Sequence, residues 1–161
     1  MQRISSAGTS IRAVAAVFKK FKFEAGTRNA DIGGGKYNDG TEFMKTLGVE
    51  NLVYDPYNRT YHHNLEVMRK VKDGQSDTVT VANVLNVIKE DEAMCKVIAQ
   101  AKMFVKPGGT VYFQIYEGDK SGVGRETIKG YQRNSKAATY QLAVSKYFDD
   151  VVVKGKFLIA K

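Results

Sequence analysis

Two acidic residues and a run of glycines have the types and spacing of a ligand-binding site. Asp31 ends a short extended segment, 28–32, and Gly33-Gly34-Gly35 follows, while Asp55 ends a second extended segment, 51–54. Glycines let the backbone turn sharply and approach a ligand closely. A carboxylate after the second strand can accept both hydroxyls of a ribose, and Asp31 could receive an ammonium group or orient the glycines. Three glycines alone more often form a plain turn, but their position between two acids favours a binding loop.

A second set of polar residues follows two later β-rich segments. Asn83 and Asn86 come after segment 78–82, and Tyr116 comes after segment 110–115. The two amides could orient an amine or a hydroxyl group, and Tyr116 could be a hydrogen-bond partner in catalysis. An asparagine after a strand is at least as often a helix cap or a turn former, and Tyr116 is equally well read as a surface loop residue.

The segment 118–136 is rich in glycine and basic residues and has no clear period. Arg125 and Arg133 could bind phosphates, and Tyr131 could stack on a base, so we expect a nucleic-acid contact through this segment. A lid over a bound ligand would need the same glycines and is an equally open interpretation. The whole chain has a net charge of +8, from 25 basic and 17 acidic residues, which fits either a polyanion partner or plain solubility.

Several other site types do not fit the residues. A dinucleotide fingerprint needs a glycine where Asn38 stands, which disfavours a nicotinamide-dependent reductase, and no Gly-Lys-Ser or Gly-Lys-Thr follows the glycines. His62 and His63 are the only histidines and Cys95 is the only cysteine, so we expect no metal site and no internal disulfide.

Length and composition predict a single globular domain over residues 1–161. Hydrophobic residues make up 43% and charged residues 26%, which excludes a disordered or coiled-coil protein. No apolar run approaches the roughly 20 residues of a membrane span, so we expect a soluble cytoplasmic protein, in the host cytoplasm if a phage encodes it.

Hydrophobic periodicity predicts helices and strands in alternation, which is typical of an α/β fold with a mainly parallel sheet. Ligands on such sheets bind at the carboxyl ends of the strands, so the loops that carry the residues above should converge on one crevice. The expected helices are 11–20, 38–47, 64–71, 90–105 and 136–146; the expected strands are 28–32, 51–54, 78–82 and 110–115, with a closing hairpin of 150–153 and 156–160.

Residues 28–115 resemble the Rossmann-like methyltransferases that use S-adenosylmethionine. The resemblance rests on Asp31-Ile32-Gly33-Gly34-Gly35, on Asp55, on the strand before Asn83 and on Lys106-Pro107-Gly108-Gly109. It implies a three-layer sandwich with a mainly parallel sheet and a C-terminal antiparallel hairpin. It also implies S-adenosylmethionine as the cofactor and transfer of its methyl group to an unidentified acceptor, with nucleic acid favoured by the charge.

A narrower resemblance concerns Asp55-Pro56-Tyr57-Asn58 and Asn83-Val84-Leu85-Asn86-Val87-Ile88, which look like segments of small phage and bacterial methyltransferases, including those associated with DNA phosphorothioation. The family pattern implies that the glycines lie against the methionine and ribose, that Asp55 holds the ribose hydroxyls, and that Asn83 lies near the transferred methyl. The cofactor-binding residues that we expect are Asp31, Gly33, Gly34, Gly35, Asp55, Pro56, Tyr57, Asn83 and Val84.

One departure from the family concerns the connection between Asp55 and Asp77. It has 21 residues and one expected helix, whereas the common fold fits another strand and helix there. The third strand should therefore be missing, and adenine would rest on Tyr57 or Val84 instead. Because the fold is shortened, an alternative is a degenerate relative without catalytic activity, which binds nucleic acid or a partner protein through its basic segment. A chain of this length has little room for target recognition, which an oligomer or a partner could supply.

Overall fold

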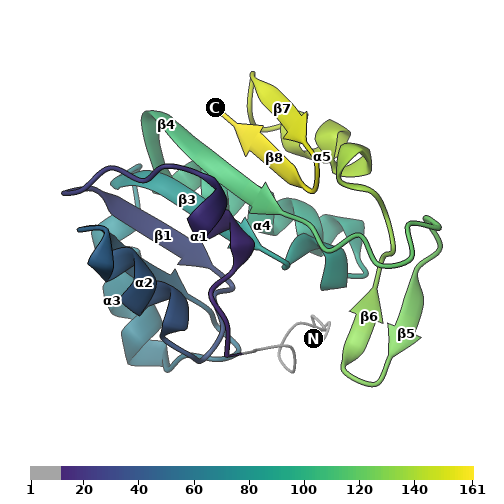
Figure 1. The fold of residues 1–161 in the computed structure, drawn as a ribbon, viewed down its shortest axis with the longest axis horizontal. Coiled ribbons are helices and arrows are strands. Elements are labelled where there is room, and N and C mark those ends of the chain that lie inside the picture. Colours follow the sequence, from purple (N-terminus) through teal and green to yellow (C-terminus); the bar gives the residue numbers. More distant parts are fainter. Residues whose placement is uncertain (1–11) are drawn as a thin grey trace.

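The computed structural model describes residues 12–161, which form a six-stranded sheet and a separate two-stranded hairpin (Figure 1). The strands are β1 (Arg28–Ile32), β2 (Glu50–Tyr54), β3 (Ser76–Ala82), β4 (Val105–Gln114), β5 (Arg125–Thr127), β6 (Gly130–Gln132), β7 (Val151–Lys154) and β8 (Phe157–Ala160). The helices are α1 (Ala16–Lys20), α2 (Asp39–Thr46), α3 (Tyr61–Val71), α4 (Asp91–Phe104) and α5 (Gln141–Ser145), with 3-10 turns η1 (Leu85–Val87) and η2 (Ala137–Tyr140).

The large sheet has the order β2-β1-β3-β4-β8-β7. Strands β2, β1, β3 and β4 are parallel to one another, whereas β8 pairs antiparallel with both β4 and β7. This confirms the mainly parallel sheet with a closing antiparallel hairpin. Helix α3 is the only helix between β2 and β3, and β2 is the edge strand, so the strand expected to be missing is absent from the described sheet.

Helices cover both faces of the sheet, with α1 in front of it and α4 behind it in Figure 1. One hydrophobic cluster joins α1 and α2 to the front face and includes Val17, Phe18 and Met44. The other joins α3, α4 and η2–α5 to the back face and includes Ile98 and Phe104. Because strand side chains alternate between faces, β4 contributes to both clusters, and the result is three layers.

The expected elements agree with the structure except where local hydrogen bonds intervene. Helix α3 begins at Tyr61, three residues before the expected start, because the Thr60 side chain accepts a hydrogen bond from the His63 N–H and caps it. The expected helix 136–146 divides into η2 and α5. Ile11, the expected start of the first helix, lies outside the described residues.

Two further differences concern segments that we expected to be turns or loops. The expected tight turn 106–109 is a wide irregularity inside β4, where the pairing with β3 jumps from Val105 to Thr110 and Gly108 has φ 79°. The segment 118–136, expected to be an irregular loop, contains the hairpin β5–β6. Three-residue strands with exposed side chains have no apolar alternation that could have indicated them.

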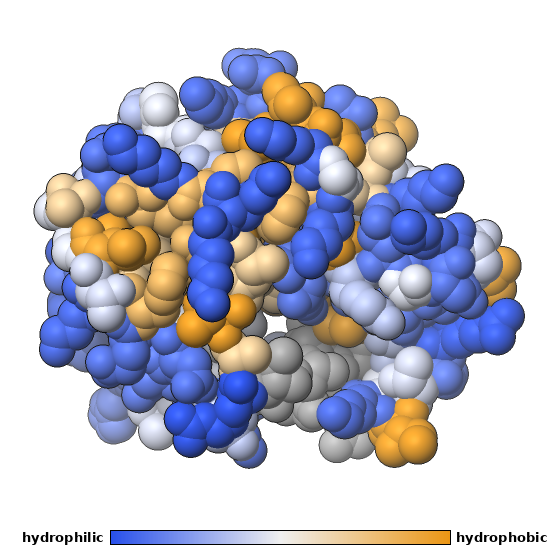
Figure 2. Space-filling view, in the orientation of Figure 1, coloured by the Kyte–Doolittle hydropathy of each residue, from blue (hydrophilic) through white to orange (hydrophobic). Residues whose placement is uncertain are grey.

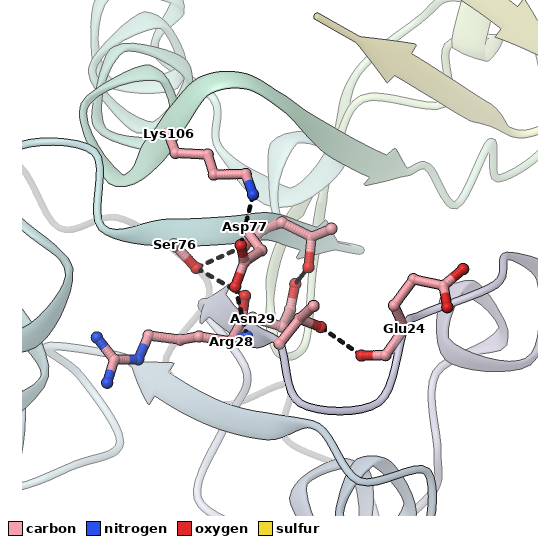
Figure 3. Close-up of polar contacts among 8 residues, drawn as sticks. Glu24, Arg28, Asn29, Ser76, Asp77 and Lys106 are labelled. Atoms are coloured by element: carbon pink, nitrogen blue, oxygen red, sulfur yellow. Dashed lines mark hydrogen bonds and ion pairs between the residues drawn. The ribbon is translucent and has the colours of Figure 1, made fainter.

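Polar contacts join the amino ends of the central strands, at the opposite end from the glycine run (Figure 3). Asp77 accepts hydrogen bonds from the Arg28 N–H at 2.8 Å and from Lys106 Nζ at 2.7 Å. The Lys106 hydrogen bond, together with that of Arg28, lowers the pKa of Asp77. The cluster therefore joins β1 to the starts of β3 and β4.

No helix of the described residues is long and apolar enough to cross a membrane.

Candidate functional site

A cavity of about 420 Å³ lies where β1, β2, β3 and β4 end. This is within the range of about 300–1,000 Å³ that is usual for small-molecule sites. Four loops and the residues before α1 form its wall, as expected for the carboxyl edge of a parallel sheet. The predicted residues that line it are Asp31, Gly33, Gly34, Gly35, Asp55, Asn83, Val84, Asn86 and Tyr116.

The glycine run is shaped by close contacts that leave no room for side chains. Gly33 has φ 71°, and a Cβ atom there would lie 2.6 Å from Cγ2 of Val84. A Cβ atom on Gly34 would overlap the carboxylate of Asp31. The Gly33 N–H also donates to the carbonyl of Tyr54, which joins the run to the end of β2. The run therefore lies directly against the Val84 side chain and the Asp31 carboxylate, both of which line the cavity.

Asp55 and Arg59 both hydrogen-bond to the backbone of Gly35, Asp55 to its N–H and Arg59 to its carbonyl. The Gly35 N–H donates to Asp55 Oδ2 at 2.9 Å, and Arg59 Nε donates to the Gly35 carbonyl at 2.8 Å. Arg59 Nη2 also donates to the carbonyl of Tyr37 at 2.9 Å. The loop after β2 therefore fixes the loop after β1.

Asp55 is buried, and its two oxygens accept four hydrogen bonds. Besides Gly35, the donors are the Tyr57 N–H at 3.0 Å, the Asn58 N–H at 3.2 Å and Asn58 Nδ2 at 3.0 Å. Four is about the number that a carboxylate can accept, so all its positions are used within the fold. The side-chain amide of Asn58, which also lines the cavity, is the donor that can leave most easily because it is not part of the backbone.

Asp31 belongs to a buried polar chain that crosses β1, β3 and, through the hydrogen bond from Asn29 Nδ2 to Asn51 Oδ1, β2. Its Oδ1 accepts a hydrogen bond from Thr80 Oγ1 at 2.9 Å, and Thr80 in turn accepts one from Asn29. Burial, and to a smaller extent the negative charge of Asp55, raises the pKa of Asp31 to about 7, against the opposing effect of the Thr80 hydrogen bond. A carboxyl group with this pKa can change charge when a cation binds beside it.

Asn83 and Gln114 connect the end of β3 with the first turn of α1. Asn83 has φ 59°, an uncommon conformation for a residue other than glycine, and its Oδ1 accepts a hydrogen bond from Gln114 Nε2 at 3.2 Å. Gln114 Oε1 accepts from the Val17 N–H at 2.8 Å. The amide of Gln114 therefore holds both Asn83 and the first turn of α1, which directly follows the wall residues 13–15.

Asn86 and Tyr116 lie together on the side of the cavity away from Asp55. Asn86 is 1% exposed, and its Oδ1 accepts a hydrogen bond from the Tyr116 N–H at 3.3 Å. The Tyr116 side chain is 58% exposed. Gln132, from β6, lines the same cavity, and its Oε1 is buried without a hydrogen-bond partner among the described residues. Polar side chains that could receive a second ligand thus gather on this side.

Two residues expected to contact a cofactor do not line the cavity. Pro56 and Tyr57 are exposed, and neither belongs to the wall. The reason is the turn that Asp55 closes with the two N–H groups that follow Pro56, which places Asn58 on the wall instead of Tyr57. Tyr57 therefore lies outside the wall, whereas Val84 belongs to it, and an adenine contact with either residue stays a prediction.

The three residues predicted to bind a substrate lie on or beside the hairpin and outside the cavity wall. Arg133 donates to the carbonyls of Ile88 and Lys89 and to Asp91 Oδ1, so its guanidinium group joins the hairpin to the loop after β3. These contacts engage the guanidinium group within the fold, and its role as a phosphate ligand stays a prediction. The Tyr131 ring lies under Lys89 Nζ, 5.6 Å away, while Arg125 is exposed. The surface over the hairpin is mainly hydrophilic (Figure 2).

Sequence reasoning missed several residues of the wall. Gln114 ends a strand that was predicted, so the rule applied to Asn83 could have found it. Tyr37, Thr41 and Asn58 lie in or after predicted loops, but nothing in their types distinguishes them. Among residues 12–161, no three His, Cys, Asp or Glu side chains are placed to hold a metal ion. His63 Nε2 is hydrogen-bonded to the carbonyl of Val53.

Neither a protein-family model nor a curated protein matches the sequence. Solved structures do match the fold. Phosphoethanolamine N-methyltransferase 2 of Haemonchus contortus, in complex with phosphomonomethylethanolamine and S-adenosylhomocysteine, is 19% identical with a TM-score of 0.59. The match covers 86% of this chain and 37% of that one, so the chain spans little more than a third of that enzyme's length.

Two other matches span nearly the whole of both chains. The CcbJ methyltransferase of Streptomyces caelestis is 10% identical with a TM-score of 0.59, over 99% of this chain and 98% of that one. A Rhodobacter sphaeroides protein whose name places it among Zn-dependent alcohol dehydrogenases is 12% identical with a TM-score of 0.55, over 90% and 86%. At these identities the likeness concerns the fold alone. The chain has the Rossmann-like fold of S-adenosylmethionine-dependent methyltransferases, without the strand beyond β2.

Proposed function

We propose that the protein is an S-adenosylmethionine-dependent methyltransferase and that the cavity beside the glycine run holds the cofactor. The observation that carries the proposal is the convergence of Asp31, Asp55 and the glycine run on one cavity of small-molecule size. The structural neighbours crystallised with S-adenosylmethionine or S-adenosylhomocysteine support the choice of cofactor.

The donor and acceptor groups of the wall fit this cofactor. Asp31, ionised, would receive the ammonium of the methionine part, and the Gly33–Gly35 backbone allows close approach. Asp55 would accept the ribose hydroxyls once the Asn58 side chain leaves Oδ2, since every other donor on this carboxylate is a backbone N–H. Val84 would provide apolar contact for the adenine.

When bound, the cofactor would supply a methyl group on a sulfonium. The methyl carbon would bond to an acceptor nitrogen or oxygen, the electrons of the broken carbon–sulfur bond would stay on sulfur, and the acceptor proton would pass to water. The residues contribute positioning and the exclusion of water, which can account for most of the rate of such a transfer. Asn83, Asn86 and Tyr116 lie on the wall where an acceptor would approach, so we assign them to its orientation.

Calorimetric titration of S-adenosylmethionine and S-adenosylhomocysteine into the purified protein tests the proposal. We expect micromolar binding that is lost in Asp55→Ala and retained in Asp149→Ala, because Asp149 is an exposed carboxylate distant in sequence from the cavity wall. A measurement of melting temperature on both variants separates a lost ligand contact from a lost fold. Absence of heat and of thermal stabilisation at millimolar ligand would overturn the cofactor assignment.

The narrower resemblance to small phage and bacterial methyltransferases, including those associated with DNA phosphorothioation, belongs to this proposal. Asn83 and Asn86, among the residues that carry it, line the cavity, whereas Pro56 and Tyr57 do not. Transfer of labelled methyl groups to phosphorothioate-containing and ordinary DNA would test it.

A second candidate is a binding protein without catalytic activity that holds nucleic acid or a partner protein through the basic segment. Arg125 and Lys129 are exposed on the hairpin, and the chain carries a net charge of +8, which favours a polyanion. This function requires oligonucleotide affinity that falls steeply with salt and is unchanged in Asp55→Ala. The methyltransferase requires cofactor binding that depends on Asp55, so the two measurements distinguish them.

A further inference from the structure

A second cavity, of about 340 Å³, adjoins the first and differs from it in charge. The two share the wall residues Asn83, Gln114 and Tyr116. The described wall of the first cavity contains two carboxylates and no lysine, arginine or histidine, whereas the second is lined by Lys120 and Lys156. A ligand that extends from the shared wall into the second cavity therefore moves from acidic to basic surroundings.

The fold places both lysines at this cavity through backbone contacts. The Lys120 N–H donates to the Glu117 carbonyl at 3.1 Å, and Lys120 has φ 63°, so a tight turn holds it. The Lys156 carbonyl accepts from the Ile115 N–H at 2.8 Å, which fixes Lys156 beside the end of β4. The two residues are 36 positions apart, so a cavity with two cations results from tertiary structure and not from a run of charge.

Neither ammonium group is neutralised by an acid of the described residues, where every ion pair within 4 Å involves other side chains. Lys156 Nζ lies 5.7 Å from the centre of the Phe157 ring, a contact that leaves its charge available. The one acidic residue of the wall, Glu117, accepts the Ala137 N–H through Oε2 at 2.8 Å and so is engaged at the start of η2. The wall therefore holds two lysines and one glutamate, and this excess of basic residues favours an anion.

We infer that the second cavity binds the anionic group, a carboxylate or a phosphate, of a small methyl acceptor. The inference rests on the proposed function, because it places the acceptor's amine or hydroxyl at the wall that both cavities share. Asn83 and Tyr116 would then contact the reacting end, while Lys120 and Lys156 hold the other end by charge-assisted hydrogen bonds. Lys120 and Lys156 are exposed, but they line one cavity, and two cations in a concave site select a compact anion better than a long polyanion, whose charges spread over an exposed face.

Amide chemical shifts measured during titration with inorganic phosphate and, separately, with acetate test the anion site without any cofactor. At constant ionic strength we expect saturable shifts at Gly118, Lys120 and Lys156. The double variant Lys120→Gln/Lys156→Gln should weaken binding about tenfold, or about 1.4 kcal/mol. Lys154→Gln, which removes an exposed lysine outside the cavity, should leave binding unchanged. The anion that binds more tightly, phosphate or acetate, identifies the anionic group of the acceptor.

Shifts that rise linearly without saturation, or that the double variant leaves unchanged, would overturn the anion site. A single-stranded oligonucleotide that displaces phosphate and shifts Arg125 and Lys129 as well would replace it with a polyanion surface. Because these titrations contain no S-adenosylmethionine, their failure is distinguishable from failure of the cofactor assignment. If both hold, labelled methyl transfer should favour ω-amino carboxylates or amino phosphates over their uncharged amides and alcohols.

Discussion

At the scale of single residues, Asp31 has the property most easily measured. Its pKa is raised to about 7, chiefly by burial, so the folded protein holds a proton there that the unfolded chain releases near pH 4. Without ligand, the free energy of unfolding therefore falls as the pH rises from about 4 to about 7, because the unfolded state binds fewer protons than the folded state in that window. Asp31→Asn should abolish this fall, as urea denaturation at several pH values would show.

The same carboxyl group should make cofactor binding depend on pH in the opposite direction. A cationic ammonium prefers ionised Asp31, so affinity for S-adenosylmethionine should rise between pH 5 and 7, by up to about tenfold per pH unit. The cofactor's own ammonium stays protonated in this range. Thr80→Val removes the hydrogen bond that opposes the shift and should move the rise to higher pH. An affinity that is flat with pH in the wild type would contradict the assignment of Asp31.

Arg59 is a positioning residue whose part can be separated from catalysis. It donates to two carbonyls of the loop after β1, at Gly35 and Tyr37, and is not on the cavity wall. Arg59→Met should speed hydrogen exchange of the loop amides and weaken cofactor affinity about tenfold, since the loop must then be ordered by the ligand. Arg69→Met, an exposed arginine on α3, is the matched control. Unchanged hydrogen exchange of the loop amides in Arg59→Met would show that Arg59 does not order this loop.

At the scale of elements, the β5–β6 hairpin depends on Arg133. Three acceptors of its guanidinium, the carbonyls of Ile88 and Lys89 and the Asp91 carboxylate, lie in or next to the loop after β3. Arg133→Met leaves two carbonyls without this donor and should cost about 2 kcal/mol of stability. Thermal unfolding and exchange at β6 would measure it. A phosphate-binding role predicts the reverse, namely weaker oligonucleotide binding with stability unchanged.

The elements also show what the sequence could and could not predict. Strand β1 has the predicted limits, because Asp31 and the glycines mark its end, and the wall residues that follow strands were found by the same rule. The hairpin was missed since its pairing depends on tertiary contacts such as Arg133, which leave no periodic pattern. That Asn58 and not Tyr57 lines the cavity could not be predicted, because the hydrogen bonds that Asp55 accepts determine which side chain of the turn faces the cavity.

At the scale of the whole molecule, the two hydrophobic clusters share one sheet, and this has a consequence for unfolding. Strand β4 directs Val111 and Phe113 into the back cluster, while Tyr112 packs on the front one. Gln114, at its end, holds α1 by the Val17 N–H. Because the same strands support both clusters, loss of packing on either face should destabilise the strands on which the other cluster depends, so residues 12–161 should unfold as one cooperative unit.

Met44→Ala tests this coupling, because Met44 is fully buried in the front cluster, across the sheet from α4. The cavity that it leaves should cost about 2–5 kcal/mol. If the domain is cooperative, slow amides of α4 on the back face should lose the same free energy in native-state hydrogen exchange as the global transition. Leu142→Ala, with a 77% exposed side chain, should change stability by less than about 0.5 kcal/mol. Back-face amides that keep their protection in Met44→Ala would divide the molecule into two units, with the cofactor cavity supported by the weaker one.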